Sequence, residues 1–180
     1  MSFSFADYQN LRNNPTTQNG ITTFWHETDS DTGIFSNWAA TPLYFDNRRF
    51  SSSEHLFMYT KAKLFNDQNI MHELQSPGLS QLEIKQLGRQ VQNFKQDTWD
   101  KHKYHFMYVA TLAKAQQNPL FRSSLSGTNN TLIIEASPRD NIWGAGIKAS
   151  DPRISNPSDW PGENALGTIL MMVRSEINAE

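Results

Sequence analysis

Hydrophobic residues recur at helical spacing through most of the chain, and a few short segments have the composition of strands instead. The pattern predicts helices at about 52–65, 66–76, 79–89, 97–117, 118–127 and 164–177. Pro77-Gly78 and Asn118-Pro119 mark helix ends, because proline lacks the N–H that a helix interior needs. Gly88 and Gly127 are expected to end the helices in which they occur.

Three of these helices have an apolar side that we expect to face the core. In the first helix that side carries Leu56, Phe57, Thr60 and Leu64. In the long helix it carries Trp99, Phe106, Val109, Ala110, Leu112 and Ala113. In the last helix, which Asn164 could cap, it carries Leu166, Ile169, Leu170 and Val173.

Strand signals are few and do not alternate with the helices. Residues 21–25 and 131–137 are rich in β-branched and apolar side chains, and 43–50 reads as a hairpin whose turn is Asp46-Asn47. Residues 147–163 contain three prolines and predict a long ordered loop. This order predicts an α+β fold. Residues 21–180 should form a single helix-rich domain with a small β-sheet. Residues 1–20 should form a polar arm with about one helical turn.

Composition narrows the functional classes. With 18 acidic and 16 basic residues, the chain is not expected to have a broad basic surface for nucleic acid. A local basic pocket for one phosphate group is compatible with this balance of charges. The absence of cysteine excludes disulfides, thiol catalysis and thiolate metal sites. The first 20 residues lack a signal-peptide pattern and no apolar run has membrane-spanning length, so we expect a cytoplasmic protein without a membrane partner.

Glu54 is the first candidate for chemistry. Ser51 and Glu54 have the spacing of a capping box, in which the glutamate only closes the start of a helix. Lys61 follows two helical turns later and lies on nearly the same face, so the two side chains could instead share a pocket. Lys63 lies off this line and is expected at the surface.

Other polar residues carry weaker signals. His55 has no second ligand at zinc-protease spacing, and a hydrogen-bonded structural histidine is an equally good interpretation. His102 and His105 also lack a second metal ligand at a suitable spacing, and we expect them to be surface or packing residues. Gly144 and Gly146 in the loop 138–146 offer either a tight turn or backbone N–H groups that a phosphate could approach, with Trp143 beside them for stacking.

Several segments occur together in an order that resembles one family. These are FSNW (35–38), SSEHLFMYTKA (52–62), GR (88–89) followed by Trp99, LIIEASPRDNIWGAG (132–146) and GENALGTILMMVR (162–174). The set is similar to the NADAR family, also called YbiA-like proteins. The resemblance extends from Phe35 to Arg174 and does not include the first 20 residues.

The resemblance implies a helix-rich α+β fold and N-glycosidase activity on ribosyl compounds, with no metal or redox cofactor. One class of members hydrolyses phosphorylated ribosylamino-pyrimidine intermediates of riboflavin biosynthesis, and another removes ADP-ribose from modified guanine in nucleic acid. A non-catalytic module that binds ADP-ribose or a nucleotide is the alternative. The segment QVQNFKQDTW after Arg89 is richer in glutamine than the basic stretch of some members, so the phosphate contacts and the choice of substrate stay open. The sequence does not indicate the oligomeric state.

The family's catalytic positions fall on Glu54, Lys61 and Asp140 of this chain. Its substrate-binding positions fall on Trp38, Arg89, Trp143, Gly144 and Asn164. A carboxylate at Glu54 would stabilise the positive charge that develops on ribose as the C–N bond breaks, or would activate water. Asp140 would hold ribose hydroxyls or water, and Lys61 would either keep Glu54 ionised or attack opened ribose as an amine. Arg89 suits a phosphate, the tryptophans suit stacking or packing, and Asn164 suits a substrate group or a helix cap.

Overall fold

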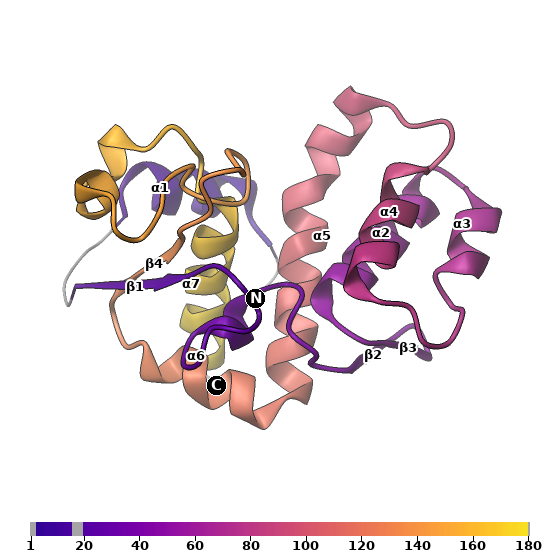
Figure 1. The fold of residues 1–180 in the computed structure, drawn as a ribbon, viewed down its shortest axis with the longest axis horizontal. Helices are drawn as coiled ribbons and strands as arrows, with labels where there is room; N and C mark the ends of the chain where they lie inside the picture. Colours follow the sequence, from indigo (N-terminus) through magenta and orange to yellow (C-terminus); the bar gives the residue numbers. More distant parts are fainter. Residues whose placement is uncertain (1–2, 16–19, 180) are drawn as a thin grey trace.

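A single long helix organises the molecule. The computed structural model describes residues 3–15 and 20–179. In this part of the chain α5 (Gln96–Gln117) stands between two groups of elements (Figure 1). One group contains α1 (Phe5–Asn13), β1 (Ile21–Phe24), α6 (Pro119–Gly127), β4 (Leu132–Glu135) and α7 (Ala165–Ile177). The other contains β2 (Leu43–Phe45), β3 (Arg48–Phe50), α2 (Ser53–Leu64), α3 (Gln68–Glu73) and α4 (Gln81–Arg89).

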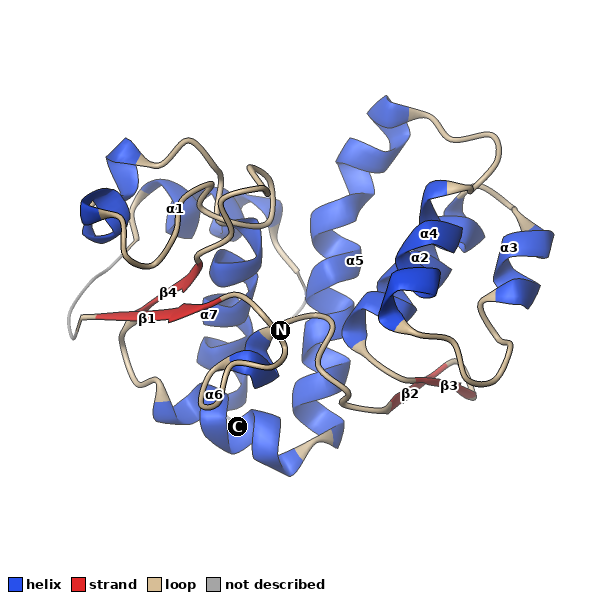
Figure 2. Ribbon diagram, viewed as in Figure 1, coloured by secondary structure: helices blue, strands red, loops and turns tan. Residues whose placement is uncertain are grey.

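The described strands form two separate pairs instead of the one small sheet that we expected (Figure 2). β1 and β4 run parallel, in a register that pairs Ile21 with Leu132, and β4 packs on α7. β2 and β3 form the predicted hairpin, whose turn residues Asp46 and Asn47 have φ of 48° and 58°. The fold is therefore α+β, with helices providing most of the framework.

The N-terminal arm contains more structure than the single turn we predicted. α1 is nine residues long, and Ser4 caps it by accepting a hydrogen bond from the Asp7 N–H. Tyr8 on this helix is buried and stacks on Tyr104 of α5 at 4.7 Å between ring centroids. The long loop before α7 contains two short 3₁₀ helices, Pro152–Ser155 and Pro157–Asp159.

Of the two interpretations of Glu54, the capping box with Ser51 is wrong. Ser52 is the cap, since its hydroxyl accepts a hydrogen bond from the His55 N–H at 3.1 Å. Ser51 instead bonds the His55 ring through its N–H and its hydroxyl, and the other ring nitrogen of His55 bonds the Leu74 carbonyl. His55 is thus the structural histidine of the two interpretations, and burial lowers its pKa. The capping box of this region is at α4, between Ser80 and Glu83.

Burial differs from the predicted amphipathic patterns in two helices. α2 is buried on almost every side, including the polar Ser53, Glu54 and His55, because it packs against both α4 and α5. In α5 the predicted residues Ala110 and Ala113 are buried, and Trp99, Phe106, Val109 and Leu112 are partly buried against the core. The other buried positions of α5 were not predicted, and they are Lys103, Met107, Tyr108, Thr111, Lys114 and Ala115. In α7 the predicted core residues Leu166, Ile169, Leu170 and Val173 are all buried.

Of the two helix ends predicted at glycines, the one at Gly88 is wrong and the one at Gly127 is confirmed. Gly88 lies inside α4, where an added Cβ would come within 1.9 Å of the Met58 sulfur, so glycine permits the close approach of α4 to α2. Gly127 is the last residue of α6. Of the helices in the described residues, none has both the length and the apolar character to span a bilayer.

Candidate active site

A cleft of about 370 Å³ lies between α2, α4, the start of α5 and the loop that follows β4. It brings together six of the eight predicted site residues, which are Trp38, Glu54, Lys61, Arg89, Asp140 and Trp143. Gly144 and Asn164 do not line it. Residues that were not among the predicted site residues complete the walls, and they include Ser36, Asn37, Lys85, Trp99, Glu135 and Arg139.

Glu54 lies in the first turn of α2 with its carboxyl group turned into the cleft. The residue is only 6% exposed, and within the described part of the chain its carboxyl group has no hydrogen-bond partner. Burial raises its pKa, and the neighbouring Asp140 adds to this, while Lys85, Arg89 and Lys61 oppose it. A carboxyl group in this setting binds a proton more readily than a solvated glutamate does.

Lys61 reaches the same cleft but does not form an ion pair with Glu54. Its ammonium group donates to the Gly88 carbonyl at 2.7 Å and lies 4.5 Å from the centroid of Phe94 and 5.5 Å from that of Trp99. Burial and the nearby Arg89 lower the pKa of Lys61, and Glu54 acts in the opposite direction. The lysine is therefore a better nucleophile at neutral pH than a solvated lysine would be.

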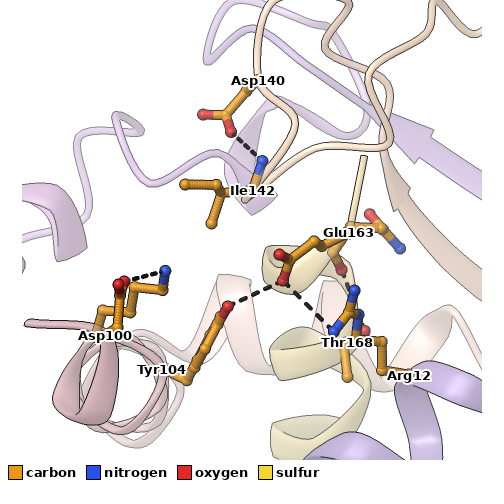
Figure 3. A network of polar contacts seen from close by, with 9 residues as sticks. Arg12, Asp100, Tyr104, Asp140, Ile142, Glu163 and Thr168 are labelled. Carbon is orange, nitrogen blue, oxygen red and sulfur yellow. Dashed lines mark hydrogen bonds and ion pairs between the residues drawn. The ribbon is translucent and has the colours of Figure 1, made fainter. Parts of the chain in front are cut away.

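Asp140 is held in place by its own loop. Its Oδ1 atom accepts a hydrogen bond from the N–H group of Ile142 at 2.9 Å (Figure 3). The same atom accepts a second hydrogen bond from the N–H group of Trp143 at 2.8 Å. These bonds, together with the one from the Ala145 N–H to the Glu135 carbonyl, use N–H groups that we had considered for phosphate binding. The loop thus supplies an oriented carboxylate to the cleft.

Glu135 is the third carboxyl group of the cleft. It ends β4, and its Oε2 atom is buried without a hydrogen-bond partner among the described residues. Burial raises the pKa of Glu135 to about 8, and the negative charges of Asp140 and Glu54 contribute to the increase. A charged residue directly after three apolar strand residues was the available sequence signal, and it also fits an ordinary strand end.

Aromatic side chains form two walls of the cleft. Trp38 lies beneath the Lys85 ammonium, which is 5.3 Å from its ring centroid. On another side Phe57 contacts both Trp99 and Trp143, at 5.1 and 5.3 Å between centroids. Flat apolar walls next to charged groups suit a ligand that combines a planar base with a phosphorylated sugar.

The position of Trp143 depends on a polar network behind it. Tyr104 of α5 meets the Trp143 ring edge to face at 6.0 Å and donates to Glu163 at 2.9 Å. Arg12 of α1 approaches the same Glu163 carboxylate from the other side, at 3.7 Å (Figure 3). The N-terminal helix is therefore connected to one wall of the cleft through Glu163 and Tyr104.

The two predicted residues outside the cleft hold its carboxyl-bearing segments. Asn164 neither caps α7 through its side chain nor contacts the cleft, because its amide accepts from the Glu135 N–H at 2.9 Å and donates to the Ile133 carbonyl at 2.9 Å. A Cβ at Gly144 would lie 2.9 Å from the Asp140 carbonyl oxygen and 3.0 Å from that of Glu135. Both residues thus fix the backbone that carries Glu135 and Asp140.

Four cationic residues, Lys61, Lys85, Arg89 and Arg139, surround the three carboxyl groups. Arg89 and Arg139 are exposed, which leaves their guanidinium groups available to an anion. Within the described residues, no group of three or more His, Asp and Glu side chains is arranged to hold a metal ion.

Comparison with known proteins gives consistent matches. Residues 23–178 match the model of the NADAR domain. N-glycosidase R617 of Acanthamoeba polyphaga mimivirus is 38% identical over 148 residues, which cover 79% of this chain and 86% of R617. N-glycosidase YbiA of Escherichia coli is 29% identical over 87% of this chain and 88% of its own length. The NMR structure of YbiA superposes with a TM-score of 0.73 at 28% identity, over 91% of this chain and 88% of YbiA.

One relative that is longer than this chain is named for riboflavin biosynthesis and not as an N-glycosidase. The riboflavin biosynthesis protein VVA0006 of Vibrio vulnificus is 28% identical over 86% of this chain, and the match spans 38% of that protein.

Proposed function

Because this chain belongs to the NADAR family, we propose that it is an N-glycosidase that hydrolyses a ribosyl C–N bond. The observation that supports the proposal best is the convergence of Glu54, Lys61 and Asp140 in one cleft with Arg89 and two tryptophans. The relatives R617 and YbiA are both named N-glycosidases. A cleft of about 370 Å³ is within the range of small-ligand sites and has room for a ribose, its base and one phosphate.

The chemistry requires a group that stabilises positive charge on ribose. Breaking a glycosidic bond gives the sugar oxocarbenium character, and a carboxylate beside the ring stabilises that charge. Glu54 serves this purpose and takes a proton from the attacking water, since burial raises the pKa of its carboxyl group and makes it a stronger base than a solvated glutamate. Asp140 holds the ribose hydroxyls or the water.

Lys61 has two possible parts in this reaction. Its lowered pKa supports an amine that attacks the opened ribose, in which case the hydrogen bond to the Gly88 carbonyl is given up. Its positive charge also favours the ionised form of Glu54, although no direct ion pair joins them. Trapping with borohydride separates the two, because only an imine between Lys61 and the sugar is reduced to a stable adduct.

The charges around the cleft favour a phosphorylated substrate. Four cationic residues face three carboxyl groups, two of which have a raised pKa, so the cleft attracts an anion. A ribosylamino-pyrimidine phosphate fits this description, and the name of the Vibrio relative points to the same pathway. ADP-ribosylated guanine also carries phosphates, and most of such a substrate would extend beyond the cleft.

The test compares both substrates in parallel. Wild-type protein and Glu54→Gln are incubated with a ribosylamino-pyrimidine phosphate and with an ADP-ribosylated guanine oligonucleotide, and the released base is measured by chromatography. Wild-type protein should release base from one of them, and Glu54→Gln should lose at least about 100-fold in kcat. Glu73→Gln, at an exposed glutamate on α3, is the matched control and should be unchanged.

Two outcomes would refute the proposal. Near-normal turnover by Glu54→Gln with unchanged circular dichroism would remove Glu54 from the reaction. Tight binding of ADP-ribose by calorimetry, without product from either substrate, would instead support the non-catalytic binding module.

A further inference from the structure

The cleft contains one carboxyl group, among the described residues, that the reaction described above does not use. Glu135 shares the cleft with Glu54 and Asp140, and the negative charges of these two neighbours disfavour the ionised form of Glu135. Glu54 and Glu135 both have a raised pKa, and neighbouring groups of this kind titrate together.

Cations are distributed unequally among these carboxyl groups. Glu54 is influenced by Lys85, Arg89 and Lys61, which favour its ionised form, whereas Lys85 alone does so at Glu135. Asp140 accepts hydrogen bonds from two backbone N–H groups through its Oδ1 atom. Glu135 receives no such donor, and its Oε2 atom is buried. Its pKa of about 8 agrees with a carboxyl group that remains protonated at neutral pH.

The fold holds Glu135 firmly while leaving its side chain without a partner. Its N–H donates to Asn164, and its carbonyl oxygen accepts from the Ala145 N–H at 2.9 Å. A buried polar group without a partner costs about 1–3 kcal/mol, so a carboxyl group that only supported the fold would be expected to have one. The arrangement instead presents an oriented, protonated carboxyl group to the cleft.

We propose that Glu135 is the catalytic acid of the cleft, and that it protonates the leaving base; this rests on the proposed N-glycosidase function. The C1′–N bond breaks and its electron pair stays on the base, which takes the Glu135 proton. The oxygen of water bonds to C1′ and its proton passes to Glu54. The products are the free base and the hydroxylated sugar, with Glu135 ionised and Glu54 protonated. Proton exchange with solvent then restores both groups.

The test uses two leaving groups of different basicity. A ribosylamino-pyrimidine phosphate leaves as a basic amine that needs a proton, whereas 4-nitrophenyl riboside 5-phosphate leaves as a stable anion. Glu135→Gln should lose about 100-fold or more in kcat on the first probe and no more than about tenfold on the second. Glu54→Gln should lose activity on both probes, and Glu73→Gln on neither.

Wild-type protein provides a second measurement that does not depend on a folded variant. Activity on the amine-leaving probe requires protonated Glu135, so kcat/KM should fall as the pH rises through about 8. The 4-nitrophenyl probe should show no such alkaline decrease. The groups that face Glu135 and contribute to this titration are Glu54 on α2, Lys85 on α4 and Asp140 in its own loop.

The outcomes separate the two proposals. If wild-type protein releases base but Glu135→Gln is as fast on the amine-leaving probe, only the assignment of Glu135 fails. Equal losses on both probes, or the same alkaline decrease with both, would also overturn it. If wild-type protein cleaves no ribosyl probe, the proposed function fails and the assignment fails with it.

Discussion

Lys114 is a buried basic residue of α5 that binds the chain segment leading to the cleft. It is 1% exposed, and its ammonium group donates to the carbonyl oxygens of Ile34 at 2.6 Å and Ser36 at 3.0 Å. The ring centroid of Phe121 lies 4.4 Å away. Burial lowers the pKa of Lys114 from 10.5 to about 7. The segment that it holds continues directly into Asn37 and Trp38 at the cleft, so we predict a measurable effect of removing this charge.

The sign and size of the effect follow from linkage. Because the folded pKa is below the unfolded one, the unfolded chain binds more protons between about pH 7 and 10.5, and stability rises with pH in this range. Below pH 7 the penalty for burying the charge is fully present. With these two pKa values, the contribution of Lys114 to the free energy of unfolding should increase by about 3 kcal/mol between about pH 7 and pH 9.5.

The assay is urea unfolding of wild-type protein and Lys114→Met at both pH values. Methionine keeps the length and the apolar packing of lysine but does not titrate. Subtracting the two proteins removes the titration of every other group, so the difference in unfolding free energy should shift by about 3 kcal/mol in favour of wild type at the higher pH. A difference that stays constant within about 0.5 kcal/mol would refute the depressed pKa and the reasoning built on it.

Three further changes test other parts of the structure. Gly88→Ala should destabilise the protein by about 1–3 kcal/mol in thermal unfolding, because the new Cβ meets Met58, and Met58→Ala should restore part of the loss. Asn164→Ala should cost about 3 kcal/mol in urea unfolding, since it leaves the Glu135 N–H and a β4 carbonyl unpaired; no loss would contradict the bonding shown here. Arg89→Gln should raise KM about tenfold for a phosphorylated ribosyl substrate, whereas an equal increase for the dephosphorylated analogue would exclude phosphate binding.

Local patterns were sufficient to predict most elements. The hairpin turn at Asp46-Asn47, the two strands of the parallel pair and the α-helices after residue 50 follow from turn chemistry and hydrophobic spacing. The errors come from contacts between distant residues. Gly88 looked like a helix end because the nearby Met58 sulfur, which requires glycine inside the helix, is 30 positions earlier in the chain.

The cleft was predictable only as a set of motifs. The ordered segments led to six of its residues, including Glu54 and Asp140, without indicating how they face one another. Glu135 was missed because a charge at a strand end usually meets solvent, and only the folded chain shows that this end points into the cleft. Asn164 was predicted to contact substrate or cap a helix, whereas its left-handed backbone, with φ of 50°, turns its amide toward β4.

The start of α2 explains how Glu54 can be a helix residue and still belong to a cleft. A helix begins with free N–H groups that need acceptors, and a capping glutamate normally provides one of them. Here Ser52 accepts from the His55 N–H, and the Asn37 carbonyl accepts from the Glu54 N–H at 3.1 Å. The Ser53 hydroxyl also donates to Asn37. Because the FSNW segment supplies an acceptor for the first turn, the Glu54 carboxyl group is not needed as a cap and can face the substrate.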